Sequence, residues 1–323
     1  MKIPIEWLLD ASPPWVQYHT RLDLLHQSET DPEVIAARAA IGEHPLVHEL
    51  LSGLSSWSVT PIKRHNNAAH PLHKLTFLAE LGLYASYPAI QTTLEQIMSH
   101  QSKEGPFQIL VNIPTHFGGS GHDEWQWMLC DTPSILYALL KFGLEEDSRT
   151  QPAVERLAGL VCEYGWPCAA APELGKFRGP GHKDDPCPYA TLIMLKALAQ
   201  STSWRDSEAC RIGAETLLEL WSERKRRKPY LFGMGTDFVK LKAPLIWYDI
   251  LHVLDVLSQF PWLHPDVRLR EMAAIVAAKA DDQGRFTPES VWLSWKGWDF
   301  GQKREPSHWL TLITTRALHR LQI

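Results

Sequence analysis

A short helical pattern recurs six times along this chain of 323 residues. In five copies a start residue is followed by leucines four and seven positions later, a spacing that keeps one face of a helix apolar. The sixth copy has a threonine and a leucine at those positions. The start residues are 56 to 61 residues apart, and each has a proline nearby, as expected in the first turn of a helix. They are Tyr18, Lys74, Thr132, Thr191, Ile250 and Thr311.

A second helical stretch and then a turn with an aromatic residue follow four of these copies. The stretches cover residues 89–100, 152–164, 207–222 and 265–280, and the turns are Gly105-Pro106-Phe107, Gly165-Trp166, Pro229-Tyr230 and Gly284-Arg285-Phe286. The repeating unit is therefore a helical hairpin followed by a long loop. Six hairpins in one domain, residues 1–323, predict an all-α fold, a single (α/α)6 barrel or toroid. An open solenoid is the alternative, but its repeats usually have about 33 to 47 residues.

Composition excludes several classes of protein. The chain is 45% apolar and 21% charged, which predicts an ordered core. A net charge of −5 predicts no binding of nucleic acid. No stretch approaches the roughly 18 apolar residues of a membrane span, and the first residues lack the apolar core of a signal peptide. We therefore expect a cytoplasmic protein with reduced cysteines, while peripheral contact with a membrane stays open.

The proline-started helices and the Gly-aromatic turns resemble the α/α toroid superfamily of terpenoid cyclases and protein prenyltransferases. The turns at Gly105 and Gly284 are similar to the degenerate Q-W and Gly-Gly-Phe repeats of that group. The resemblance covers nearly the whole chain. It implies a toroid whose inner helices surround a cavity, and it implies an enzyme acting on an isoprenoid or another apolar small molecule. The superfamily also contains non-catalytic domains, so fold alone does not give function.

Long loops lead into the inner helices of the predicted barrel, at 108–131, 167–188, 229–246 and 284–308. Long loops in a compact domain are usually functional, and these are rich in Trp, Cys, His and charge. Aromatic rings at the helix starts are candidates for the wall of a substrate cavity. The alternative is that the rings fill the centre of the barrel. The cavity candidates are Trp127, Tyr189, Trp247, His308 and Trp309.

A proton donor is expected near the start of the third inner helix. Cyclases of this superfamily that begin by protonation use the middle Asp of a D-x-D-D pattern followed by Thr. The matching segment here is Met128-Leu129-Cys130-Asp131-Thr132, so Cys130 stands at the position of the acid. We take Asp131 and Cys130 as candidate catalytic residues, together with Tyr248 and Asp249 at a later helix start. The alternative role for Asp131 is to cap the helix.

A zinc site is the second hypothesis. Asp185-Pro186-Cys187-Pro188-Tyr189 resembles the Asp-x-Cys-Tyr element of protein prenyltransferases, with one proline inserted. The resemblance implies zinc held by Asp185, Cys187 and a later histidine, for which His308 is the candidate. Three such ligands suit a tetrahedral zinc ion with one open position. A diphosphate substrate would instead bring Mg²⁺.

Cations in the same loops are candidates for holding a diphosphate or another anion. They are Arg178, Lys242 and Arg304. We therefore expect a terpenoid cyclase or prenyltransferase-like enzyme, an isomerase or a transferase. Two further alternatives stay open: a six-hairpin carbohydrate-active enzyme, which needs paired carboxylates in a groove, and a non-catalytic interaction domain.

Overall fold

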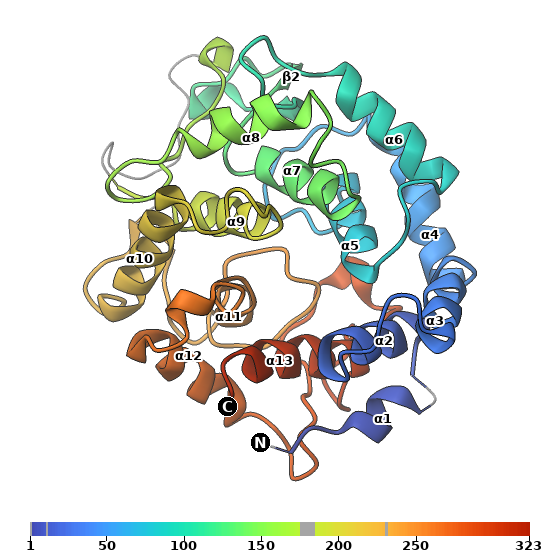
Figure 1. The fold of residues 1–323 in the computed structure, drawn as a ribbon. Coiled ribbons are helices and arrows are strands. Elements are labelled where there is room, and N and C mark those ends of the chain that lie inside the picture. The colour runs from blue at the N-terminus through green and yellow to red at the C-terminus, as the bar shows by residue number, and fades with distance from the viewer. Residues whose placement is uncertain (1, 11, 175–184, 230–231) are drawn as a thin grey trace. The chain divides into compact units, whose positions relative to one another are not determined.

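A computed structural model describes residues 2–10, 12–174, 185–229 and 232–323. Within these ranges the chain is mostly helical, with one two-stranded sheet (Figure 1). No helix in these ranges is both long and apolar enough to cross a membrane. Contacts divide the chain into two compact units. Unit 1 holds residues 1–50, 80–83 and 235–323, and unit 2 holds residues 51–79 and 84–234.

Unit 1 joins the two ends of the chain. Helix α13 packs on α2 and on the π-helical turn η1 that continues α2, and also on α11 and α12. Proline stands at the first or second position of α2 and α3, where its missing N–H costs nothing. The elements are α1 (Ile5–Leu9), α2 (Pro14–His19), η1 (Thr20–Leu24), α3 (Pro32–Gly42), α4 (Pro45–Gly53, which runs into unit 2), α11 (Ile250–Leu257), α12 (Val267–Ala277) and α13 (His308–Arg320), with short 3-10 turns at Pro261–Leu263 and Leu293–Trp295.

Unit 2 is built around α9, which packs against α7, α8 and α10 (Figure 1, green to gold). Every residue of α9 is buried, which explains why its sequence is apolar except for Thr191 and Lys196 and the hydroxyl of Tyr189. The elements are α5 (Pro71–Leu81, whose last two residues belong to unit 1), α6 (Pro88–Ser99), β1 (Ile109–Asn112), β2 (Asp123–Gln126), α7 (Thr132–Lys141), α8 (Thr150–Ala158), α9 (Pro188–Leu198) and α10 (Glu208–Ser222), with 3-10 turns at Leu54–Ser56, Thr115–Phe117 and Pro172–Leu174.

The six starts predicted from the repeat all lie in helices: α2, α5, α7, α9, α11 and α13. The second stretches correspond to α6, α8, α10 and α12, although α8 ends at Ala158, before the predicted end at residue 164. The antiparallel pair β1 and β2 was not expected, since residues 108–131 were predicted to be a loop. The run Ile109-Leu110-Val111 favours a strand because branched side chains fit a pleated surface, and it pairs with Gln126, Trp125 and Glu124 in that order.

One hydrogen bond recurs between the aromatic turns and the helices that follow. The Thr132 hydroxyl donates to the carbonyl of Phe107 at 3.3 Å, Thr191 Oγ1 accepts from the Trp166 amide at 3.1 Å, and Thr311 Oγ1 accepts from the Phe286 amide at 2.9 Å. The separation along the chain is 25 residues in all three. Two of these pairs lie in unit 2 and one in unit 1. The backbone atom differs at Thr132, but the equal spacing of the three threonine contacts supports the internal repeat.

Candidate functional site

The residue just before a repeat helix can cap the helix with its side chain, and one of these residues does not. The residue before α9, α11 and α13 accepts a hydrogen bond from the helix amide three residues on: Cys187 Sγ, Asp249 Oδ1 and Ser307 Oγ do this. Such caps satisfy amides that have no partner within the helix. Asp131 stands at the same place before α7, yet its side chain makes no cap bond. Its carboxylate is used elsewhere.

Asp131 pairs with His65, from the loop before α5. The ring nitrogen Nδ1 of His65 lies 2.9 Å from Oδ2 and 3.1 Å from Oδ1 of the carboxylate. The side chain of Asp131 is 1% exposed and that of His65 is 29% exposed, so the imidazole is the accessible partner. Burial opposes a charge on His65, but the Asp131 carboxylate outweighs it and raises the pKa of His65 to about 9. His65 is therefore an imidazolium at neutral pH, hydrogen-bonded to the side chain of Asp131.

Two neighbouring histidines, one in the same loop and one in α5, hold the loop that carries His65. His73 Nε2 lies 2.9 Å from the His65 carbonyl, and His70 Nε2 lies 2.9 Å from the carbonyl of Thr60. Because a carbonyl only accepts, each of these nitrogens carries the proton. Burial lowers the pKa of both residues, for His73 to about 4, so both are neutral at pH 7. His65 is thus the cation of this group.

Three thiols lie beside the pair. Cys130 Sγ is 4.0 Å from Cys187 Sγ, and Cys168 also hydrogen-bonds to Cys130. The contacts with Cys168 and Cys187, together with burial, raise the pKa of Cys130 well above its usual value. Burial and the nearby charge of Asp131 likewise raise the pKa of the Tyr189 hydroxyl. Cys130 and Tyr189 therefore stay protonated at neutral pH and are poor nucleophiles.

The predicted residues Asp131, Cys130, Cys187 and Tyr189 thus come together in unit 2, and Trp127 is buried in the same unit. The structure adds His65, which sequence reasoning missed. The signal for it is the run of three histidines at positions 65, 70 and 73 before and within an inner helix. That run does not by itself indicate which histidine meets a carboxylate 66 residues away.

The remaining catalytic and cavity candidates belong to unit 1. Asp249 is fully buried, caps α11 and lies 3.8 Å from Lys242 Nζ. Tyr248 and Trp309 are buried, and the Trp247 carbonyl lies 2.8 Å from His252 Nδ1.

Of the predicted anion contacts, Lys242 sits over the Trp292 ring at 4.6 Å and Arg304 is exposed. Arg178 lies outside the described residues.

The predicted zinc ligands are in different surroundings. Asp185 lies 3.6 Å from Arg227 Nη2, and Cys187 lies beside Cys130. His308 belongs to unit 1 and stacks on Trp7, with ring centroids 4.0 Å apart. Within the described ranges, no group of three or more His, Cys, Asp or Glu side chains is arranged to hold a metal ion. Zinc binding by this set stays a prediction.

Comparisons with known proteins give no family. No family model matches the chain, and no curated protein matches it. Among solved structures, a protein from Actinoplanes is similar with a TM-score of 0.42 and 13% sequence identity, over 96% of this chain and 90% of that one. Similarity at this level establishes neither a shared fold nor a shared activity.

Proposed function

We propose that this protein is an enzyme of the terpenoid cyclase and prenyltransferase type. In this proposal it moves a proton at the His65–Asp131 pair during the reaction of an apolar, isoprenoid-like substrate. The observation that carries the proposal is the side chain of Asp131. It stands where a helix cap is expected, and it forms a buried ion pair with an accessible imidazolium instead. Buried pairs with shifted pKa values are concentrated at functional sites.

The chemistry follows from the protonation states. The hydrogen bonds from the His65 ring to Asp131 use Nδ1, which leaves the Nε2–H for a substrate. An acid with a pKa of about 9 is too weak to protonate a carbon–carbon double bond, but it matches an oxygen that gains negative charge. His65 is therefore the proposed general acid for a departing or opening oxygen, as in an allylic diphosphate, alcohol or epoxide. Asp131, suggested as the acid by its sequence position, becomes the residue that positions His65.

The proposal also covers the closure of the fold, the cell compartment and the substrate. The threonine bond recurs at three of the six repeats and supports their common origin, and we propose that all six hairpins close into a single (α/α)6 toroid. We further propose a cytoplasmic protein with a small apolar molecule as substrate. An apolar substrate of this kind partitions into lipid, which is a reason for peripheral membrane contact.

A substrate series tests the proposal. Isoprenoid alcohols, epoxides and diphosphates of increasing length are incubated with the protein, with Mg²⁺ present or absent, and products are identified by mass spectrometry. We expect turnover of at least one class, reduced about a hundredfold or more by His65→Gln and by Asp131→Asn. The rate should also fall as the pH rises through about 9, where His65 loses its proton.

His48→Gln and Asp282→Asn are matched controls, because both side chains are exposed and belong to unit 1, whereas the pair lies in unit 2. They should leave the rate unchanged. Full turnover in both site variants would refute the role of the pair. Loss of turnover in Cys130→Ser but not in His65→Gln would assign the chemistry to the thiols.

A further inference from the structure

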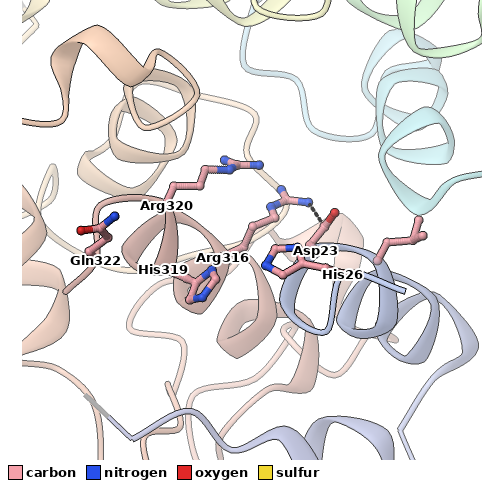
Figure 2. A pocket seen from close by; sticks show the side chains of 7 residues that line it. Asp23, His26, Arg316, His319, Arg320 and Gln322 are labelled. Carbon is pink, nitrogen blue, oxygen red and sulfur yellow. Dashed lines mark hydrogen bonds and ion pairs between the residues drawn. The ribbon is translucent and has the colours of Figure 1, made fainter. Parts of the chain in front are cut away.

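Unit 1 contains a cavity that the proposed function does not use. Its volume is about 520 Å³, within the range of small-molecule sites. It lies between the π-helical turn η1 and the C-terminal end of α13 (Figure 2). The polar residues that line it are Asp23, His26, Arg316, His319, Arg320 and Gln322.

A chain of ion pairs links three of the lining residues, Asp23, Arg316 and Arg320, through Asp255. Arg316 Nη1 lies 3.1 Å from Asp23 Oδ2, and Arg316 Nη2 lies 3.3 Å from Asp255 Oδ1. Arg320 Nη1 lies 3.3 Å from the same oxygen of Asp255. Both guanidinium groups are thereby fixed in orientation on one side of the cavity. Fixed guanidinium groups lose less side-chain entropy when they bind a ligand.

The lining offers mainly hydrogen-bond donors to a ligand. The only carboxylate among the lining residues, Asp23, already accepts from Arg316 and lies 3.2 Å from His19 Nδ1. Burial opposes the charge of Asp23, but His19 and Arg316 outweigh it and hold its pKa well below the usual range. The bonds of Arg320 to Asp255 and Ser258 all use Nη1, so its Nη2 and Nε are not committed by them. Two histidines and a glutamine add further N–H groups.

The backbone around the cavity is unusual at three places. Among the described residues, His26 and Gln322 are the two non-glycine residues with positive φ, at 53° and 57°. Both line the cavity, and the turn that carries Asp23 is a π-helix. A left-handed conformation costs a non-glycine residue free energy, and π-helical turns are frequent at functional sites. Both residues directly follow the C-cap of a helical turn, where a left-handed residue commonly ends the helix, and these two helix ends place their side chains at the cavity.

We propose that this cavity binds the phosphate group of a small phosphorylated molecule. Arg320 contacts the phosphate oxygens through Nη2 and Nε, with the guanidinium of Arg316 beside it, and His26, His319 and Gln322 contact them from the rim. Donors from several directions suit a tetrahedral group with three terminal oxygens better than a planar carboxylate. The cavity volume leaves room for the rest of the molecule. This site is independent of the His65–Asp131 pair, which lies in unit 2.

Isothermal titration with inorganic phosphate and with glycerol 3-phosphate tests the proposal, against sodium chloride and acetate at equal ionic strength. We expect saturable binding of both phosphates with one site per chain, and none of acetate. His26→Gly and His319→Ala should each weaken binding at least tenfold. His48→Ala, an exposed histidine outside the cavity, should bind like the unchanged protein.

Folding is separated from binding by the choice of glycine at position 26. Since glycine adopts positive φ without strain, His26→Gly should keep or raise the melting temperature while it weakens phosphate binding. Equal binding by all variants, or equal binding of acetate and phosphate, would overturn the proposal. Sedimentation with phosphatidic acid vesicles distinguishes the source of the phosphate: capture that His26→Gly abolishes assigns the site to a lipid headgroup, and its absence assigns the site to a soluble ligand.

Discussion

At the scale of single residues, the candidate site depends on one side chain that departs from its repeat. Sequence alone placed Asp131 at a helix start and left two roles open, a cap or an acid. A cap is a local interaction and is predictable from a few residues. The pairing with His65 joins residues 66 positions apart, and only tertiary packing decides it. For this reason the position of the carboxylate was predictable and its partner was not.

Stability should depend on pH through this pair. The pKa of His65 is about 9 in the folded chain against an ordinary 6.5, so its contribution is complete below about pH 6.5 and is lost as the pH rises through 9. We expect the free energy of unfolding, measured with urea, to fall by on the order of 3 kcal/mol between these values. Asp131→Asn should flatten this part of the profile. Parallel profiles for the two proteins would contradict the pairing.

Substitutions at two glycines distinguish the cost of backbone strain from the cost of steric crowding. Gly143 and Gly165 have similar positive φ values, 79° and 88°. A side chain at Gly143 would meet nothing within 4 Å, whereas a Cβ at Gly165 would lie 2.9 Å from Thr216 Oγ1. Gly143→Ala should therefore cost only the strain, about 1 to 2 kcal/mol. Gly165→Ala should cost roughly 1 kcal/mol more, because Thr216 must also move. Equal losses in thermal unfolding would show that the turn at Gly165 has room to adapt.

At the scale of elements, the hydrophobic spacing predicted six helix starts, and all six lie in helices. It did not predict β1 and β2, since a four-residue strand carries little periodic signal. It also missed the charged residues inside apolar helices. Asp255 lies in α11, whose other residues are apolar except for His252, and its partners Arg316 and Arg320 lie one turn apart on α13. An acid within an apolar helix was the available signal.

The threonine that joins three of the aromatic turns to the helices that follow should matter for stability. Thr311→Val leaves the buried Phe286 amide without its acceptor, which should cost about 1 to 3 kcal/mol. Thr315 lies one turn further along α13, and its buried hydroxyl has no hydrogen-bond partner. Thr315→Val should therefore be neutral or slightly stabilising. Urea unfolding of both variants measures the difference, and equal effects would mean that the repeated bond contributes nothing specific.

At the scale of the whole molecule, the points where the chain passes between its two units bear on the prediction of a single domain. It passes from one unit to the other at 50–51, 79–80, 83–84 and 234–235, and the first two passages fall within α4 and α5. Domains that fold separately are usually joined by exposed linkers with few crossings. Two helices that belong to both units therefore favour cooperative folding of residues 1–323 as one domain.

Solution scattering and unfolding test this prediction together. A single compact domain of this length should have a radius of gyration of about 20 Å, and two units that move apart should exceed this clearly. One domain should also unfold in a single transition, with the same midpoint by circular dichroism and by tryptophan fluorescence. Both units contain tryptophans, for example Trp309 in unit 1 and Trp166 in unit 2, so separate unfolding would appear as two fluorescence steps. The variant Trp166→Phe then identifies the step that belongs to unit 2, because only the unfolding step of unit 2 would lose fluorescence amplitude.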